Sequence, residues 1–219
     1  MKQQNTSAGV ERGSRADFIR EAERLFAERG VNGVGIREIV ASVGHKNVAS
    51  VRYHFGTKEN LIREIMIEGL RKSEQWRIDQ LNALEKGGNE ITIRDILLIV
   101  VGPVRHKIVT ETFMLFLAQV SLSDHKFYDD VINSEIQVGM KRCVNYLREL
   151  SASGSEDIFD TRMSLLSLYA TAFLNSQSWK RSKGGVMWRK SVNWRSSALL
   201  NHFLETAEAM LKPTRAPVL

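Results

Sequence analysis

The segment Ile36–Lys58 constrains the fold of this chain more than any other, because it combines two short helical patterns with a glycine between them. In the first pattern, apolar residues recur at helical spacing, at Ile36, Ile39, Val40 and Val43. This spacing predicts an amphipathic helix of about two turns. Gly44 follows and can adopt the left-handed backbone conformation that ends a helix. The chain is therefore expected to turn sharply and begin a second helix.

The second pattern, from Val48 to Phe55, predicts a helix whose two sides differ in chemistry, since successive side chains are about 100° apart. The apolar side carries Val48, Val51 and Phe55, the opposite side carries Ala49, Ser50 and Tyr53, and the flanks carry Asn47, Arg52 and His54. Small, hydrogen-bonding side chains suit a helix that enters the major groove of DNA, which is about 12 Å wide, and contacts base edges. On this face alone, a surface helix packed on a bundle is an equally good interpretation.

Two flanking patterns complete a small helical unit. Upstream, Ser14 or Arg15 is expected to open a helix that Gly30 ends, with apolar positions at Phe18, Ala22, Leu25 and Phe26. Downstream, Thr57 is a natural N-cap for a helix whose apolar positions begin with Leu61, Ile62, Ile65 and Met66. The N–H groups at such a helix start attract a phosphate, and Lys58 adds positive charge there.

Two motifs in this unit resemble the N-terminal signature of the TetR-type transcriptional regulators (TetR/AcrR family). The first is Leu25-Phe26-Ala27-Glu28-Arg29-Gly30, and the second is Tyr53-His54-Phe55-Gly56-Thr57-Lys58-Glu59-Asn60-Leu61. The resemblance covers roughly residues 12–70. The chain departs from the family pattern on its expected reading surface. It has Val34-Gly35 where a Ser or Thr cap is common, a turn lengthened at His45 to Asn47, and Arg52 where Tyr is frequent.

The resemblance implies an all-α fold, with a three-helix helix-turn-helix head and a C-terminal helical body that binds a ligand and dimerises. It also implies that some residues contact double-stranded operator DNA, namely Arg15, Arg37, Lys46, Asn47, Ala49, Ser50, Arg52, Tyr53, His54 and Lys58. Arg37, Asn47, Ala49, Ser50 and Arg52 would approach bases, while Tyr53, His54 and Lys58 would hold phosphates. Base contacts carry sequence discrimination and phosphate contacts carry much of the affinity.

The function implied by the resemblance is sequence-specific transcriptional regulation. The expected regulator is a homodimeric repressor, released from a near-palindromic operator by a small, largely apolar effector. The alternative is a helical adaptor or ligand-binding protein of the same fold that does not bind an operator. The net charge of +6 favours an anionic partner, although scattered Lys and Arg are usually solvated surface.

Enzymatic and membrane functions find no support in the sequence. The five histidines are dispersed, and no arrangement typical of a metal site, a phosphate-binding loop or a nucleophile elbow is present. We therefore expect no catalytic residue, no metal and no cofactor. A lone Cys143 cannot form an internal disulfide, and no run of about 18 apolar residues or signal-peptide core occurs. A cytoplasmic protein without stable membrane insertion is expected.

The rest of the chain keeps a helical pattern. Helices are predicted from Lys58 to about Leu84, and over Ile93–Ile108, Thr112–Leu122, Lys126–Leu150, Glu156–Trp179 and Val192–Leu211. Pro103 is expected to kink or split the helix that contains it. The predicted domains are a flexible arm (1–13), the DNA-binding head (14–57), a connecting helix (58–86), a helical effector-binding and dimerisation domain (87–212) and a tail (213–219).

Three features of the body bear on its partners. An apolar face that could bury one side against a second copy comprises Leu165, Leu168, Ala172, Leu199, Leu200, Phe203, Leu204 and Ala207. Residues that could line an effector cavity are Phe113, Met114, Phe116, Leu117, Phe127, Tyr146 and Phe173. Plain internal core is the alternative for both sets. The basic, tryptophan-rich segment 178–195 is predicted to be a glycine-hinged connection, or else a surface that binds an anionic ligand, nucleic acid or a membrane surface.

Overall fold

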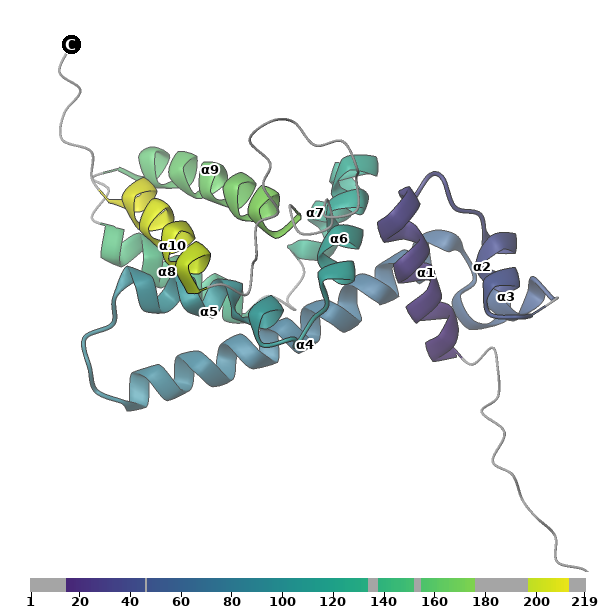
Figure 1. The fold of residues 1–219 in the computed structure, drawn as a ribbon, viewed down its shortest axis with the longest axis horizontal. Coiled ribbons are helices and arrows are strands. Elements are labelled where there is room, and N and C mark those ends of the chain that lie inside the picture. The colour runs from purple at the N-terminus through teal and green to yellow at the C-terminus, as the bar shows by residue number, and fades with distance from the viewer. Residues whose placement is uncertain (1–14, 46, 134–137, 152–154, 176–196, 213–219) are drawn as a thin grey trace, which may run out of the picture.

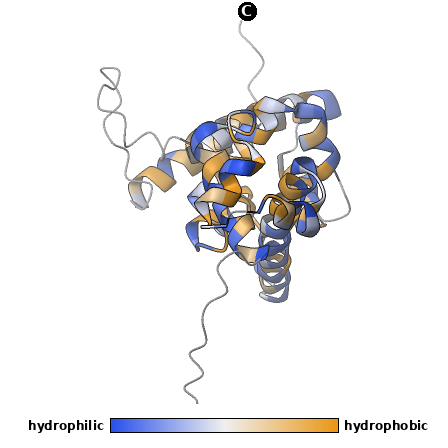
Figure 2. Ribbon diagram, turned by 90° about the vertical axis from the view of Figure 1, so that its right-hand side faces the viewer, coloured by the Kyte–Doolittle hydropathy of each residue, from blue (hydrophilic) through white to orange (hydrophobic). Residues whose placement is uncertain are grey.

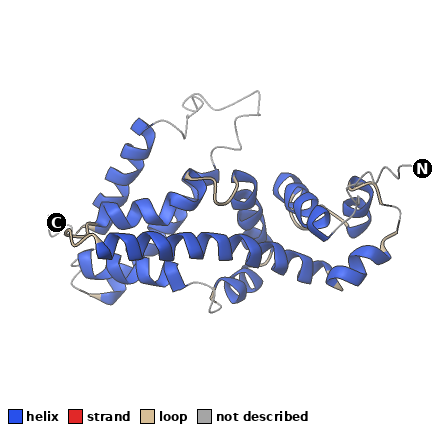
Figure 3. Cartoon of the chain, turned by 90° about the horizontal axis from the view of Figure 1, so that it is seen from below, coloured by secondary structure: helices blue, strands red, loops and turns tan. Residues whose placement is uncertain are grey.

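The computed structural model describes residues 15–45, 47–133, 138–151, 155–175 and 197–212, and all regular structure within these ranges is α-helical (Figure 3). The all-α fold class is therefore confirmed. In chain order the helices are α1 (Arg15–Arg29), α2 (Ile36–Ser42), α3 (Ala49–Phe55), α4 (Lys58–Lys86), α5 (Ile93–Arg105), α6 (Glu111–Ser123), α7 (His125–Ile132), α8 (Val138–Ser151), α9 (Glu156–Asn175) and α10 (Ser197–Leu211).

The longest helix, α4, runs along the molecule and connects its two ends (Figure 1). Helices α1, α2 and α3 form one end, which we call the head. Helices α5, α8, α9 and α10 gather at the other end, and α6 and α7 lie between the two groups. Figure 2 shows apolar and polar residues interleaved along the helices, as expected for amphipathic helices around a core.

The buried apolar residues form two clusters, and consecutive helices do not always belong to the same cluster. The first joins the head and the start of α4 to α6 and α7, with Phe18, Phe26, Val51, Phe113, Phe116 and Val131 among its buried members. Phe26 of α1 stacks on Phe116 of α6 at 6.1 Å between ring centroids. The second joins the end of α4 to α5, α8, α9 and α10, with Leu81, Ile96, Leu147, Phe159 and Phe203 among its members. Helices α6 and α7 therefore pack with the head, although the boundaries at 57 and 86 remain predictions.

A buried polar joint fixes α4 against α8. The Glu74 carboxylate accepts hydrogen bonds from the N–H groups of Gly139 (2.6 Å) and Met140 (3.1 Å), and from Arg77 Nη1 (2.8 Å). Both charged side chains are almost fully buried. An unpaired charge at such depth would be costly, and the ion pair together with the two amides offsets much of that cost. Nearby Cys143 is buried, which raises the pKa of its thiol to about 11.

The same joint explains the largest error in the predicted helices. A single helix over Lys126–Leu150 is wrong, because α7 ends at Ile132 and α8 begins at Val138. In an unbroken helix the N–H groups of Gly139 and Met140 would bond to carbonyls four residues earlier. Here those N–H groups are satisfied by Glu74, so α8 has a start of its own.

The other predicted helices agree with the structure to within a few residues. The helix with Pro103 is not split, although it ends two residues later, at Arg105, instead of reaching Ile108. Gly30 and Gly44 end α1 and α2 with positive φ of 79° and 77°. The predicted extensions 176–179 and 192–196, the arm 1–13, segment 178–195 and the tail lie outside the described residues. Over the part of the chain that is described, no helix has the length and hydropathy needed to cross a bilayer.

Candidate nucleic-acid interface

The turn between α2 and α3 is built by backbone geometry and one side chain. Gly35 precedes α2 without a side-chain cap, as predicted from the missing Ser or Thr. Beyond Gly44, the Asn47 side-chain oxygen accepts a hydrogen bond from the N–H of Ala49 at 2.9 Å, and so satisfies an N–H group at the start of α3. The Asn47 amide therefore has a local structural role beside its predicted base contact. Lys46, also predicted at the DNA, lies outside the described residues.

Helix α3 has the two faces that the sequence predicts. Val51 and Phe55 are buried against the head, at 1% and 4% exposure, and Val48 is half-buried just before the helix. On the other side Ala49, Arg52 and Tyr53 are exposed, with Tyr53 at 86%. Ser50 is half-buried. An exposed face with small side chains, an arginine and a tyrosine is suited to a DNA groove.

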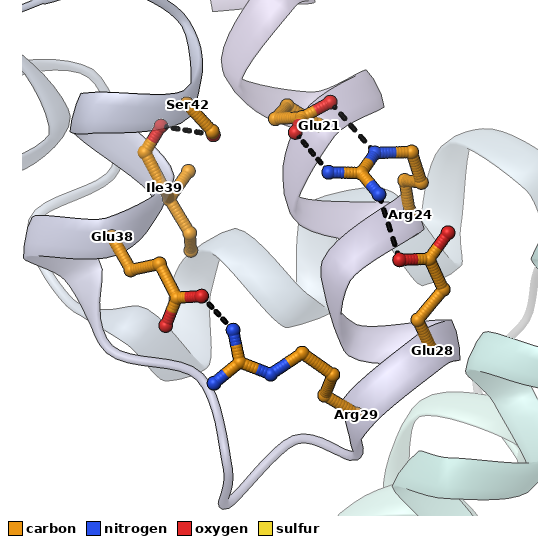
Figure 4. Close-up of polar contacts among 7 residues, drawn as sticks. All are labelled: Glu21, Arg24, Glu28, Arg29, Glu38, Ile39 and Ser42. Carbon is orange, nitrogen blue, oxygen red and sulfur yellow. Dashed lines mark hydrogen bonds and ion pairs between the residues drawn. The ribbon is translucent and has the colours of Figure 1, made fainter.

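Most arginines of the head are already paired with carboxylates of the protein (Figure 4). Arg24 bonds to Glu21 and to Glu28 on its own helix, at 2.5 Å and 2.7 Å, and Arg29 of α1 pairs with Glu38 of α2. Beyond this view, Arg20 pairs with Asp17, and Arg15 pairs with Glu64 of α4 while its guanidinium lies over the Phe55 ring. Carboxylates offset the charge of these four arginines, and two of the pairs also join helices: Arg15 links α1 to α4, and Arg29 links α1 to α2.

The two remaining arginines of α1–α3 are different. Arg37 of α2 and Arg52 of α3 are exposed, and neither side chain has a hydrogen-bonding or ionic partner among the described residues. Each is on one of the two helices that the sequence assigns to DNA. A cation without an internal partner loses no protein contact when it binds a phosphate or a guanine edge. The structure thus leaves Arg37 and Arg52 as the available cations of the two helices.

Lys58, predicted to hold a phosphate, also makes contacts within the protein. Its Nζ donates a hydrogen bond to the carbonyl of Val31 at 2.6 Å and lies 5.5 Å from the centroid of the Phe26 ring. Burial lowers the pKa of this ammonium group. In this geometry Lys58 ties the start of α4 to the segment between α1 and α2. An ammonium group has three N–H donors, so the bond to Val31 leaves donors for the predicted phosphate contact, which stays a prediction.

The end of α3 and the start of α4 meet the predicted pattern. Gly56 has a positive φ of 73°, and the Thr57 hydroxyl accepts the N–H of Asn60 at 3.1 Å, which confirms Thr57 as the N-cap of α4. His54 is half-buried, with its ring 6.1 Å from Phe18 and 5.3 Å from Tyr53. His54 therefore packs on the head while Tyr53 remains free to reach a DNA backbone.

The residues predicted to line one effector cavity do not come together. Phe113, Phe116 and Leu117 are buried in the first apolar cluster, and Met114 and Phe127 pack against it. Tyr146 and Phe173 pack against the second cluster instead, and the Tyr146 hydroxyl bonds to Glu85 at 2.8 Å. The prediction of a single cavity is wrong for this set, because helical spacing does not reveal which of two clusters a residue joins. Plain core, the alternative interpretation, describes them better.

The predicted dimer face also divides. Leu165, Leu168 and Ala172 of α9 are exposed, Leu165 and Leu168 at 53% and 68%. Leu199 and Leu200 of α10 are half-buried. Phe203, Leu204 and Ala207 are at most 1% exposed within one chain, so they are core residues that a partner cannot reach. Ile158 of α9, at 46% exposure, was missed by the sequence analysis, although it lies seven residues before Leu165 on the same side of the helix.

A small cavity between head and body was not predicted from the sequence. Glu23 of α1 and Thr110 are among the residues that line it. A sign was available in the sequence. Glu23 lies four residues after Ile19, on the apolar side of α1, where a carboxylate is unexpected. Its partner Thr110 is 87 residues away and could not be found by spacing.

The N-terminal part of the chain is similar in sequence to known regulatory proteins. Residues 18–65 match the family described as bacterial regulatory proteins, tetR family. The HTH-type transcriptional regulator QacR of Staphylococcus aureus (strain Mu50 / ATCC 700699) is 39% identical over 61 residues. That match covers 27% of this chain and spans about a third, 32%, of the length of the relative.

Solved structures resemble the chain over nearly its whole length. A bacterial regulatory protein in the tetR family from Rhodococcus RHA1 has a TM-score of 0.59 at 17% identity, over 94% of this chain and 100% of that chain. A tetR family transcription regulator from Shewanella sp. PV-4 has a TM-score of 0.57 at 14% identity, over 90% and 94%. At such identities the likeness shows the fold, head and body together.

Proposed function

We propose that this chain, which belongs to the TetR family of bacterial regulatory proteins, is a DNA-binding transcriptional repressor that acts as a homodimer. The observation that carries this proposal is the charge arrangement of the head. Four of the six arginines in α1–α3 are paired with carboxylates, and the two that are free, Arg37 and Arg52, lie on α2 and α3. Within the head, the unpaired arginines therefore lie only on the two helices of the helix-turn-helix pattern.

In this proposal the exposed side of α3 enters the major groove. Arg52 and Ser50 contact base edges, Ala49 permits close approach of the helix, and Tyr53 holds a phosphate. Arg37 reaches the same groove from α2. An arginine that bonds to a guanine edge contributes about 1–3 kcal/mol of discrimination against the wrong base. Arg29 and Glu38 support this surface from behind, since their ion pair joins α1 to the first turn of α2.

The second part of the proposal is a two-fold dimer through α9. Ile158, Leu165, Leu168 and Ala172 form an exposed apolar stripe on this helix. Its members are spaced seven, three and four residues apart, which is the spacing of a helix that packs against another helix. Two copies joined in this way would present two α3 helices to an operator with inverted half-sites.

Release from the operator is proposed to follow binding of a small, largely apolar effector in the body. An effector can shift the protein away from its DNA-bound state only by binding the other state more tightly. Such coupling is reciprocal, because operator DNA must weaken effector binding by the same factor. Helix α4 is the natural connection, since it contributes to both apolar clusters.

The direct experiment is gel retardation with the full chain and DNA from the region flanking its own coding sequence, in the presence of excess unrelated DNA. The proposal expects a retarded complex that the double variant Arg37→Ala/Arg52→Ala does not form. The matched control, Arg20→Ala/Arg24→Ala, removes two paired arginines and should keep the complex. A helical adaptor of the same fold would retard no fragment selectively.

A further inference from the structure

A small cavity lies where the head meets the rest of the molecule. It is lined by α1, α4, the segment 108–110 and the start of α6, is partly open to solvent, and has a volume of about 80 Å³. Ile19, Ile65, Val109 and Phe113 contribute apolar walls. For comparison, a dry engineered cavity of about 150 Å³ holds benzene. The space here is thus suited to a short aliphatic chain that extends toward solvent.

The polar groups of the cavity are Glu23, Glu68, Lys72 and Thr110. Lys72 Nζ is already paired with Glu68 Oε1 at 2.8 Å. Glu23 instead accepts a hydrogen bond from the Thr110 hydroxyl, at 3.1 Å. That hydroxyl in turn accepts the N–H of Phe113 at 2.9 Å, so its position is fixed by the start of α6. Glu23 therefore has a fixed neutral donor and, among the described residues, no cation within ion-pairing distance.

This arrangement leaves a half-buried negative charge beside an apolar wall. Burial raises the pKa of Glu23, although Thr110 and the more distant Lys72 act against that shift. A nearby cation stabilises the charged form of a carboxylate that has lost part of its hydration. The rest of the ligand should be apolar, because a polar group against the apolar walls would lose its hydrogen bonds to water. A compact ammonium group with an aliphatic tail has this chemistry.

We infer that this cavity is a binding site for a small alkylammonium ion, with the ammonium group on the Glu23 carboxylate and the alkyl chain against Ile19, Ile65 and Phe113. Neither the DNA-binding surface nor the predicted effector residues, Phe113 apart, contribute to it. Its walls come from the head helix α1 and from α4 and α6. The inference stands apart from the proposed function, because it requires neither an operator nor a dimer.

The test is a titration of the full chain with n-butylammonium, followed by NMR of selectively labelled isoleucine methyl groups. The methyl resonances of Ile19 and Ile65 should shift in a saturable manner, while that of Ile96, buried in the second apolar cluster, should not. n-Butanol supplies the tail without the charge, and butyrate reverses the charge. Each should bind roughly tenfold more weakly, because a hydrogen bond between an ammonium group and a half-buried carboxylate is worth about a tenfold change in affinity.

The variant Glu23→Gln keeps an acceptor for Thr110 and removes the charge, so the affinity for n-butylammonium should fall roughly tenfold. Its fold is verified by an unchanged Ile96 resonance and by its unfolding transition. Glu21→Gln, two residues away and bonded to Arg24, is the matched control and should leave the affinity unchanged.

Affinity of the natural chain should also fall as the pH is lowered through the raised pKa of Glu23, since protonation removes the charge. Equal binding of n-butanol, unchanged affinity of Glu23→Gln, or no shift of Ile19 and Ile65 at saturating ligand would each overturn the inference.

Discussion

At the scale of single residues, the head is organised by which charges are paired. The sequence alone pointed to Arg37 and Arg52, because they occur on the two helices of a recognisable motif. It could not show that Arg15 pairs with Glu64, which is 49 residues away, or that Lys58 bonds to Val31. Such pairs depend on how α1, α3 and α4 pack together. Residues in a local pattern were thus predictable, and the partners that bring distant elements together were not.

The unpaired arginines should matter for DNA binding and the paired ones should not. Arg37→Ala or Arg52→Ala is expected to weaken binding to the preferred operator by about 1–3 kcal/mol, with a smaller loss on random DNA. Arg24→Ala removes an arginine that is bonded to Glu21 and Glu28, and should change neither affinity appreciably. Fluorescence anisotropy on both DNAs at one fixed salt concentration measures these differences. Equal losses from Arg52→Ala and Arg24→Ala would contradict the assignment.

Lys58 should contribute to the stability of the head. Lys58→Met removes the hydrogen bond to Val31 and is expected to lower the free energy of unfolding by about 1 kcal/mol. Lys126→Met, which removes an exposed ion pair with Asp130, is the control and should have little effect. Urea unfolding followed by circular dichroism gives both values. If Lys58→Met instead lost DNA affinity on every sequence with its stability unchanged, Lys58 would act mainly as the predicted phosphate contact.

At the scale of helices, local signals predicted starts and ends well wherever the cap was local. Gly30, Gly44 and Thr57 each end or begin a helix as their chemistry predicts. The break between α7 and α8 was missed because the groups that satisfy the start of α8 belong to Glu74, more than 60 residues earlier. When a residue of a distant helix caps a helix start, the sequence around that start does not indicate it.

The Glu74 joint should be far more important for stability than an exposed ion pair on the same helix. Glu74→Ala leaves Arg77 buried without its carboxylate and the N–H groups of Gly139 and Met140 without an acceptor, so a loss of about 3–5 kcal/mol is expected. Glu68→Ala breaks an exposed pair with Lys72 and should cost less than about 1 kcal/mol. Chemical denaturation with a common slope compares the two variants. Similar small losses would mean that the joint does not hold α4 to α8.

At the scale of the whole molecule, the core consists of two apolar clusters, and the order of the helices along the chain does not reveal which helix joins which cluster. The chain is predicted to be a head, a connecting helix and a body, yet α6 and α7 share an apolar cluster with the head. Apolar spacing showed which residues would be buried, including Phe113 and Phe203, but could not assign them to one cluster or the other. This is why the residues predicted to line an effector cavity fall in two clusters, and why three of the eight residues of the predicted dimer face are core.

The exposed stripe on α9 should mediate self-association. Leu165→Glu/Leu168→Glu adds two charges to positions that are 53% and 68% exposed in one chain, so folding should be preserved while a dimer is lost. The matched control is Leu122→Glu, at an 84% exposed position on α6. Sedimentation velocity is expected to give a monomer for the double variant and a dimer for the natural chain and the control. A dimer that survives the double variant would require another interface.

The most direct measurement of the central claim, sequence-specific DNA binding, is selection of binding sites from a random duplex library with the purified chain. We expect enrichment of DNA with two inverted half-sites whose centres are about one helical turn apart. Enriched DNA should bind at least about 1,000-fold more tightly than scrambled DNA. That preference should collapse in the Arg37→Ala/Arg52→Ala variant. If the natural chain enriches no sequence, or binds enriched and scrambled DNA equally, the chain is not the DNA-reading regulator proposed here.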